Sequence, residues 1–269
     1  MATSHYALAL ALLRVVTGFI VWQHGAQTFA GMLGGAAAAT GTLQWFVGGA
    51  ECFGGIAIGV GMFTRPVALF VAADMAVLYL TTYLPLGFPP IVTRPGEVAC
   101  LLVNINLLLA FTGPGRWSVD GDSGADRAAD GWRTSLRGLS RYMPTALGVI
   151  RVLMGLLLVS YGLRKMFGML GADAEPLLSL QWYAGIVELV GGAGIVAGLF
   201  TKPTAFLCCG QMAFAYFINH NPRGFFPIQN GGERAALFCY FFLLLWTIGP
   251  GRWSLDGPLH RRRTARGRV

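Results

Sequence analysis

The chain has 269 residues, of which 55% are hydrophobic and only 12% are charged, and its formal net charge is +8. A soluble domain usually carries about 25% charged residues, so most of this chain must face something other than water. The composition excludes a large soluble enzyme domain and predicts an integral membrane protein. The positive charge does not indicate a nucleic-acid partner, because no soluble module combines basic and aromatic residues.

Eight apolar segments follow one another along the chain, and most approach the ~20 residues that a helix needs to span a bilayer. The first is too long for a signal peptide and contains Arg14, so we interpret it as a span. The expected fold class is all-α, with eight transmembrane helices arranged as two pseudo-symmetric four-helix bundles. The segments lie at residues 6–29, 43–63, 66–84, 97–112, 144–165, 179–200, 203–219 and 233–249.

An internal repeat supports this division into two bundles. The sequence Phe-Thr-Arg-Pro at 63–66 returns as Phe-Thr-Lys-Pro at 200–203, and Gly-Pro-Gly-Arg-Trp-Ser at 113–118 returns unchanged at 249–254. Because each unit has an even number of spans, the two units should run parallel and pack about an axis along the membrane normal. We expect a first unit at 1–120, a polar cytoplasmic linker at 121–143, a second unit at 144–256 and a basic disordered tail at 257–269.

Lysine and arginine residues gather on the side of the membrane that would hold both termini. The linker and the tail supply most of them, and Arg65 and Lys202 lie between the second and third spans of their units. Loops on the cytoplasmic side carry an excess of Lys and Arg, so both termini are expected in the cytoplasm. The basic tail also predicts contact with anionic membrane lipid at that face.

Ionisable residues inside spans are costly in lipid and usually face the protein interior in pairs. Arg14 and Arg151 lie on glycine-lined stripes of the first and fifth spans, and Glu51 and Glu188 lie on similar stripes of the second and sixth. At ~1.5 Å of rise per residue, the depths of these residues differ by less than a side chain can reach. The sequence therefore predicts the ion pairs Arg14–Glu51 and Arg151–Glu188, one inside each bundle.

Asp74, on the third span, lies near the same depth and is expected to share Arg14, whereas its repeat counterpart is Gln211. Two interpretations of these charges stay open. In one they are structural and fix the register between helices. In the other they form a buried site for protons or a quinone head group, in which Arg14, Glu51, Asp74, Arg151 and Glu188 are the catalytic residues.

A second polar layer is expected at the outer ends of the helices. His24 and His220 end the first and seventh spans, and their repeat counterparts are Tyr161 and Tyr83, so each unit supplies one His and one Tyr. A His beside a Tyr and a Glu exchanges protons near neutral pH. The open alternatives are interfacial anchoring of these rings and helix capping by Glu233. The residues expected to bind a cofactor here are His24, Glu97, Tyr161, Lys165, His220 and Glu233.

The five cysteines all lie inside apolar runs, and none forms a Cys-x-x-Cys pair. This pattern favours small buried side chains over a disulfide framework or a zinc site. The spacing of the His and Glu residues is not that of a metal motif, so no metal is predicted. No haem-attachment, phosphate-loop or flavin motif is found.

The order of these motifs resembles that of the DoxX family of small four-helix membrane proteins. The resemblance covers nearly all of both repeats, whereas ordinary members hold one unit and would pair to form what this chain makes covalently. The first repeat departs from the pattern, with Tyr83 where the late signature has His. The resemblance is carried by Leu13-Arg14-x-x-x-Gly18, His24-Gly25, Glu51 with Gly54-Gly55, Ala215-Tyr216-Phe217, His220-x-Pro222-x-Gly224-Phe225-Phe226-Pro227 and Asn230-Gly231-Gly232-Glu233.

The resemblance implies a helical bundle in the cytoplasmic (inner) membrane of a prokaryote. Relatives in the DoxX/DoxD group include a subunit of a thiosulfate:quinone oxidoreductase, and others are linked to thiol and oxidative-stress complexes. The expected function is therefore a membrane subunit of a quinone-linked oxidoreductase acting on thiosulfate or thiol-type donors, with a quinone as cofactor.

Expected partners are membrane lipid, a soluble or membrane redox subunit and a second copy of the chain. Two alternatives to this function stay open. One is a non-enzymatic membrane scaffold or small-solute carrier with a cavity between the two repeats. The other is a membrane enzyme acting on a lipid-like substrate.

Overall fold

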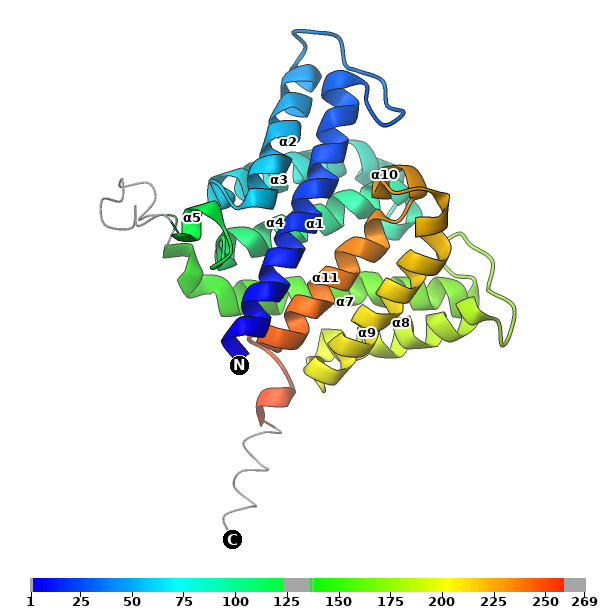
Figure 1. Cartoon of the computed structure of the whole chain (residues 1–269). Helices are drawn as coiled ribbons and strands as arrows, with labels where there is room; N and C mark the ends of the chain where they lie inside the picture. Colours follow the sequence, from blue (N-terminus) through cyan, green and yellow to red (C-terminus); the bar gives the residue numbers. More distant parts are fainter. Residues whose placement is uncertain (1, 123–135, 137, 259–269) are drawn as a thin grey trace.

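The structure is a computed structural model, and it describes residues 2–122, 136 and 138–258. Every regular element among these residues is a helix, which confirms the predicted all-α class. α3 and α9 each continue through a π-helical turn. The helices are α1 (Ala2–Ala30), α2 (Leu43–Val60), α3 (Thr64–Leu78), α4 (Arg94–Thr112), α5 (Val119–Asp122), α7 (Met143–Phe167), α8 (Leu180–Ala197), α9 (Thr201–Ala215), α10 (Pro227–Asn230) and α11 (Glu233–Ile248), shown in Figure 1.

The helices are those of a multi-pass integral membrane protein. Among the described residues, six helical segments are long and apolar enough to cross a bilayer. The remaining two expected spans correspond to α9 and α11, which have 15 and 16 residues. Most of the expected linker and almost all of the expected tail fall outside the described residues. The six segments are Ser4–Ala30, Leu43–Val60, Thr64–Leu86, Pro95–Thr112, Gly138–Phe167 and Leu180–Ala197.

The second helix of each repeat begins and ends at matching signals. The side chains of Thr42 and Ser179 accept hydrogen bonds from backbone N–H groups in the first turns of α2 and α8. At the other end, Gly61 and Gly198 adopt left-handed φ values of 77° and 63°. A hydroxyl side chain is a common N-cap at the start of a helix, and a left-handed glycine is a common C-cap at its end. Both repeats have these caps at equivalent positions.

The first helix of each repeat packs against the last helix of the other repeat. α1 forms a hairpin with α2 and contacts α11 on its other side, while α7 forms a hairpin with α8 and contacts α4. Contact between α1 and α4, the end helices of one repeat, is far smaller. The predicted arrangement as two four-helix bundles is therefore not confirmed, because α1 and α7 pack against the last helix of the opposite repeat. The two hairpins project from the shared body in different directions (Figure 1).

The hairpins are held together by glycines at which the backbones of the two helices touch. A Cβ atom added to Gly25 would lie 2.1 Å from the backbone nitrogen of Cys52, and one added to Gly162 would lie 2.5 Å from that of Leu189. A Cβ on Gly55 would lie 2.3 Å from the nitrogen of Trp22. These contacts confirm the predicted glycine-faced packing, in which small residues let helices approach closely in lipid.

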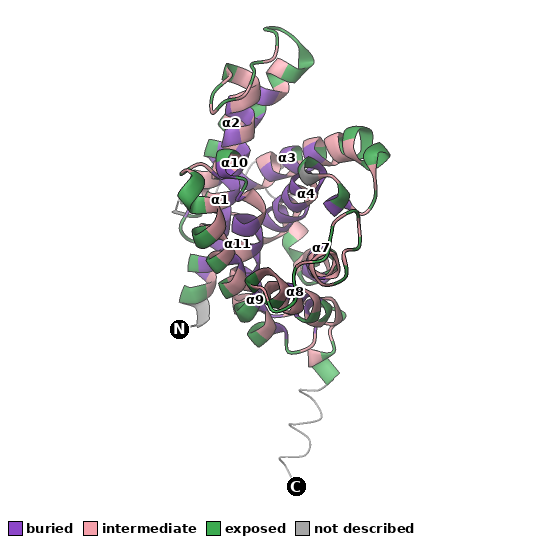
Figure 2. Ribbon diagram, turned by 90° about the vertical axis from the view of Figure 1, so that its right-hand side faces the viewer, coloured by how far each residue is buried: buried purple, intermediate pink, exposed green. Residues whose placement is uncertain are grey.

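The packed core lies between α1, α4, α7 and α11, whose facing sides are largely buried (Figure 2). The outer helices instead carry large exposed apolar side chains, as expected of surfaces that face lipid. Fully buried core residues include Leu10, Leu13, Leu102, Leu158, Phe238 and Phe242. Exposed residues of the outer helices include Phe53, Val77, Val190, Phe206 and Leu207.

Replacing Gly25 by Ala should destabilise the protein, because the new methyl group would meet the α2 backbone, which cannot move aside as a side chain can. Overpacking of this kind costs about 1–3 kcal/mol or more. Gly210→Ala is the matched control, since nothing lies within 4 Å of a Cβ built at that helical glycine. Thermal unfolding in mild detergent should give a lower midpoint for Gly25→Ala only. Equal midpoints for the two variants would contradict the backbone contact between α1 and α2.

Candidate functional site

Arg14 on α1 binds backbone carbonyls at the end of α2 and in the loop after α4. This is the face of the protein that the sequence predicts to be cytoplasmic. Its Nε donates to the carbonyl of Gly59, in the last turn of α2, at 3.3 Å. Its two terminal nitrogens donate to the carbonyls of Pro114 and Trp117, in the loop that follows α4. The last carbonyls of a helix have no partner within the helix, so one guanidinium satisfies the end of α2 and ties the loop to it.

Arg151 on α7 repeats this arrangement in the second half of the chain. Its Nε donates to Pro250 O at 2.9 Å and its Nη2 to Trp253 O at 3.0 Å. Its Nη1 donates to the carbonyls of Ile195 and Val196 in the last turn of α8. Arg151 is fully buried, and the five N–H donors of a guanidinium suit a site lined by carbonyl oxygens.

An aspartate completes each of these loop attachments. Oδ2 of Asp120 accepts a hydrogen bond from Thr64 N at 3.1 Å, at the start of α3. Asp256 accepts from Phe200 N at 2.7 Å and Thr201 N at 2.9 Å, at the start of α9. The repeated loop therefore caps one helix through its aspartate and receives the arginine through its carbonyls. We name each set of contacts the arginine clasp.

The predicted ion pairs Arg14–Glu51 and Arg151–Glu188 are wrong, and so is the sharing of Arg14 by Asp74. Within the described residues, the hydrogen bonds of both arginines go to backbone carbonyls. Arg14 lies level with Gly59, which is eight residues beyond Glu51 on α2, or about 12 Å along a helix. The two arginines thus connect helix ends to loops, and the buried carboxylates have other partners.

Four helices bring Glu51, Asp74, His24 and Glu233 together, and we name this group the histidine site. Nε2 of His24 on α1 lies 2.7 Å from Oε1 of Glu233 on α11. Glu51 on α2 lies beside both His24 and Asp74, which is on α3. Glu51 is 5% exposed and the side chain of Glu233 is 12% exposed, whereas that of His24 is 31% exposed. His24 is thus the most exposed of these three side chains, although its Nε2 atom, which faces Glu233, is buried.

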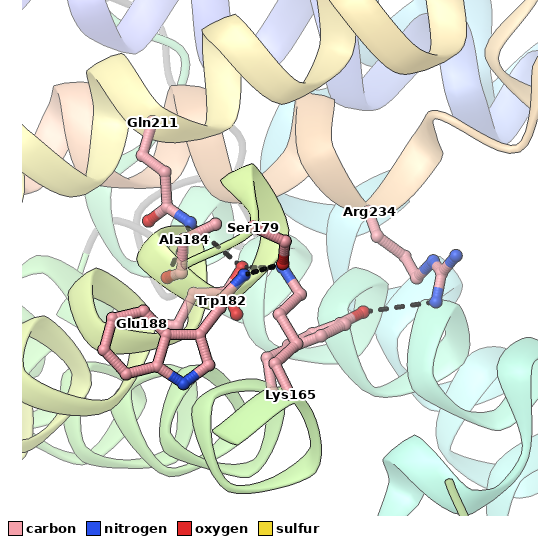
Figure 3. Close-up of polar contacts among 8 residues, drawn as sticks. Lys165, Ser179, Trp182, Ala184, Glu188, Gln211 and Arg234 are labelled. Atoms are coloured by element: carbon pink, nitrogen blue, oxygen red, sulfur yellow. Dashed lines mark hydrogen bonds and ion pairs between the residues drawn. The ribbon is translucent and has the colours of Figure 1, made fainter. Parts of the chain in front are cut away.

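A second group, the lysine site, lies at the equivalent place in the other half. Nζ of Lys165 on α7 lies 2.6 Å from Oε1 of Glu188 on α8, and Nε2 of Gln211 on α9 donates to the same oxygen at 3.0 Å. Figure 3 shows these two side chains converging on Glu188.

The lysine site continues to the other repeat through Arg234 on α11. Nη1 of Arg234 lies 3.2 Å from Oε2 of Glu97 and donates to the hydroxyl of Tyr161 at 3.3 Å. Glu97, on α4, is fully buried, and its carboxyl lies beside the Tyr161 hydroxyl. Each carboxylate of the lysine site thus has a cation of its own, Lys165 for Glu188 and Arg234 for Glu97.

The two sites are built from equivalent positions of the repeat. At these positions each takes three residues from one repeat and a glutamate from the last helix of the other, because α1 and α7 pack against the opposite repeat. The lysine site also includes Lys165 and Arg234. The matching pairs are His24 with Tyr161, Glu51 with Glu188, Asp74 with Gln211, and Glu233 with Glu97.

The sites differ in charge. The histidine site holds three carboxyl groups and one imidazole, and no Lys or Arg is among the partners that the structure describes for them. The lysine site holds two carboxylates and two cations.

Both repeats match the same family model, described as DoxX, at residues 9–84 and 146–221. The chain belongs to the DoxX family. The tandem match confirms two DoxX units in one chain, as the internal repeat predicts. No solved structure matches the chain.

Two curated relatives each match about half of the chain. An uncharacterized protein of Haemophilus influenzae is 34% identical over 137 residues, which make up 47% of this chain and 100% of that protein. An uncharacterized membrane protein of Mycobacterium tuberculosis is 32% identical over 143 residues, 46% of this chain and 87% of that protein. Both relatives therefore have the size of one repeat.

One predicted cofactor-binding residue of this DoxX protein lies apart from both sites. Nδ1 of His220 contacts the backbone carbonyl of Asn230 at 3.1 Å, so the ring supports the loop before α11. Asn230 accepts from Gly232 N at 2.7 Å, as a capping residue does, but Glu233 turns to His24 and does not complete a capping box.

Two residues that join the repeats were missed by the sequence analysis. Arg234 pairs with Glu97, and its position in the first repeat is Val98, so comparison of the repeats offered a signal. Gln23 is fully buried and its Oε1 accepts from Ile228 N, in α10, at 3.1 Å. Its repeat counterpart is Ser160, but nothing in the sequence showed which segment Gln23 would reach.

Replacing Arg151 by Met should lower the stability of the protein, because the carbonyls in its clasp lose their donor while the side-chain volume is kept. Each buried carbonyl left without a partner costs about 1–3 kcal/mol. Arg151→Lys should restore little, since an ammonium group cannot replace the planar fork. Arg252→Met, at an exposed arginine of the same loop, is the control. The clasp is disproved if thermal unfolding of Arg151→Met matches that of Arg252→Met.

Proposed function

We propose that this protein is the membrane subunit of a quinone-linked oxidoreductase acting on thiosulfate or thiol-type donors, and that the histidine site exchanges the protons of the reaction. Reduction of a quinone to a quinol takes two electrons and two protons. A membrane subunit that serves this reaction therefore needs a proton-exchanging group within reach of the lipid layer. The contact between His24 and Glu233, next to Glu51, is the observation that carries the proposal.

The composition of the histidine site suits proton exchange. An imidazole changes its charge near neutral pH, and here it lies between two glutamates. Carboxyl groups that meet away from water repel one another when both are ionised, so they share protons. His24 is more exposed than Glu233 and lies beside Glu51, so its imidazole can pass a proton between the two glutamates.

The lysine site has no imidazole and no unpaired carboxyl group among its described residues, so it does not suit proton exchange. This difference between the two sites supports the proposal. Lys165 and Arg234 each neutralise one carboxylate there, so the site is balanced without added protons. We assign it a structural role as the ion-paired counterpart of the histidine site.

An aromatic cluster beside the histidine site supports a quinone as the cofactor. Phe19 stacks on Trp22 at a ring-centroid distance of 5.7 Å and on Phe226 at 6.0 Å, and Phe225 meets Phe19 edge to face. Flat aromatic rings stack favourably, which is how a quinone ring would be held. The cluster and the histidine site share one interface, since both join α1 to the chain around α10 and the start of α11.

We also propose eight spans in the inner membrane of a prokaryote, with both termini in the cytoplasm. Together with its π-helical turn, α9 reaches residue 220, and its repeat counterpart Thr64–Leu86 has the length and hydropathy of a span. The basic linker and tail support a cytoplasmic location for that face and contact with anionic lipid. A soluble or membrane redox subunit would deliver the electrons there or at the outer face.

His24→Tyr tests the proposal, because the other repeat already carries Tyr161 at this position and the fold should tolerate it. The protein would be purified in mild detergent, analysed for co-extracted quinone, and assayed for quinol formation with thiosulfate or a small thiol. We expect His24→Tyr to keep the unfolding midpoint and to lose at least 10-fold in turnover. Tyr161→Phe is the control and should keep its turnover.

Two results would contradict the proposal. One is full turnover in His24→Tyr, which would remove the histidine site from the reaction. The other is the absence of both bound quinone and quinol formation in the wild-type protein, which would favour the scaffold or carrier function.

A further inference from the structure

Two cysteines from neighbouring helices of the second repeat face each other. Sγ of Cys209 on α9 lies 3.7 Å from Sγ of Cys239 on α11, and both are free thiols. α9 and α11 pack closely, so the two sulfurs stay near one another. A disulfide bond is about 2.0 Å long, so small side-chain rotations bring these thiols to bonding distance. The pair leaves no local pattern in the sequence, because its members are 30 residues apart.

The first repeat does not contain this pair. Its residues at the equivalent positions are Ala72 and Val103, which cannot undergo thiol chemistry. The fold therefore needs only small apolar side chains at these positions, and the second repeat has a thiol at both. This difference gives two substitutions, Cys209→Ala and Cys239→Val, that the other half of the molecule already accommodates.

The pair lies where a reagent dissolved in lipid reaches it. Both cysteines are partly buried against the core, and neither is sealed inside it. α9 also carries exposed apolar side chains on both sides of Cys209 in the sequence, at Leu207 and Phe214. Cys239 follows Glu233 of the histidine site by six residues on α11, about 9 Å along the helix.

We propose that Cys209 and Cys239 form a redox-active dithiol that a membrane quinone oxidises. The proposal rests on the quinone-linked function above and names a thiol as the donor. A quinone accepts two electrons and two protons, and a dithiol gives up the same number when it closes to a disulfide. One dithiol therefore supplies the two electrons and two protons that reduce one quinone to the quinol.

The two half-reactions balance. The S–H bonds of Cys209 and Cys239 break, one S–S bond forms, and the two electrons and two protons convert the two carbonyl groups of the quinone into the two hydroxyl groups of the quinol. Two molecules of a donor thiol then restore the pair by thiol–disulfide exchange, through a mixed disulfide, and leave as the donor disulfide.

The test counts free thiols in the full chain reconstituted in lipid nanodiscs. The reduced protein is exposed to a short-chain ubiquinone without oxygen, denatured, alkylated with a maleimide and weighed by mass spectrometry. The wild-type protein should lose two of its five alkylation sites and form one quinol per chain, with a peptide linking Cys209 to Cys239. Cys209→Ala and Cys239→Val should lose none. Cys100→Ala, a change to the residue of the other repeat, should behave as the wild type.

Two outcomes overturn the dithiol, and both differ from failure of the proposed function. In the first, diamide closes the pair but the quinone leaves all five thiols free. In the second, Cys209→Ala turns over a thiol donor and quinone at the wild-type rate, while His24→Tyr does not. Conversely, if the quinone closes the pair but no donor reopens it and no turnover is found, the dithiol stands as a quinone-reactive centre and the oxidoreductase function fails.

Discussion

The contact on which the rest of the structure depends is that between the first helix of one repeat and the last helix of the other. Through α1 with α11 and α7 with α4, a glutamate at the start of each last helix enters the polar group of the opposite repeat. Neither repeat has a complete site alone. A chain with only one repeat would have to pair with a second copy to form these contacts, whereas this chain makes them within one molecule.

Two sets of contacts stabilise this arrangement, and neither involves the residues that differ between the two sites. Glycine-faced hairpins fix α1 to α2 and α7 to α8, and the arginine clasps fix the opposite ends of the same helices. The scaffold is similar in both halves, and differences at a few equivalent positions give the two sites different charges. His24 corresponds to Tyr161, and Asp74 to Gln211, while Lys165 and Arg234 add cations to the lysine site alone.

Much of the architecture could be predicted from the sequence, because repeats, apolar segments and glycine stripes are local patterns. The buried arginines and glutamates were also identified, but their partners were not. The predicted pairs assume that α1 and α2 have level ends, but α1 extends past the end of α2, so Arg14, twelve residues from the start of α1, meets that end. The exchange of helices between repeats leaves no local pattern, and neither does the approach of Cys209 to Cys239.

Cross-linking tests the exchange most directly. In a chain without native cysteines and with a protease site between residues 123 and 135, His24→Cys would be combined either with Glu233→Cys or with Glu97→Cys. A short bifunctional maleimide should keep the two halves joined after cleavage in the 24/233 variant, because His24 contacts Glu233. In the 24/97 variant both cysteines lie in one half, so the halves should separate. Separation of the 24/233 halves, with an internal cross-link in the 24/97 variant, would mean that each repeat closes on itself, and would contradict the shared sites.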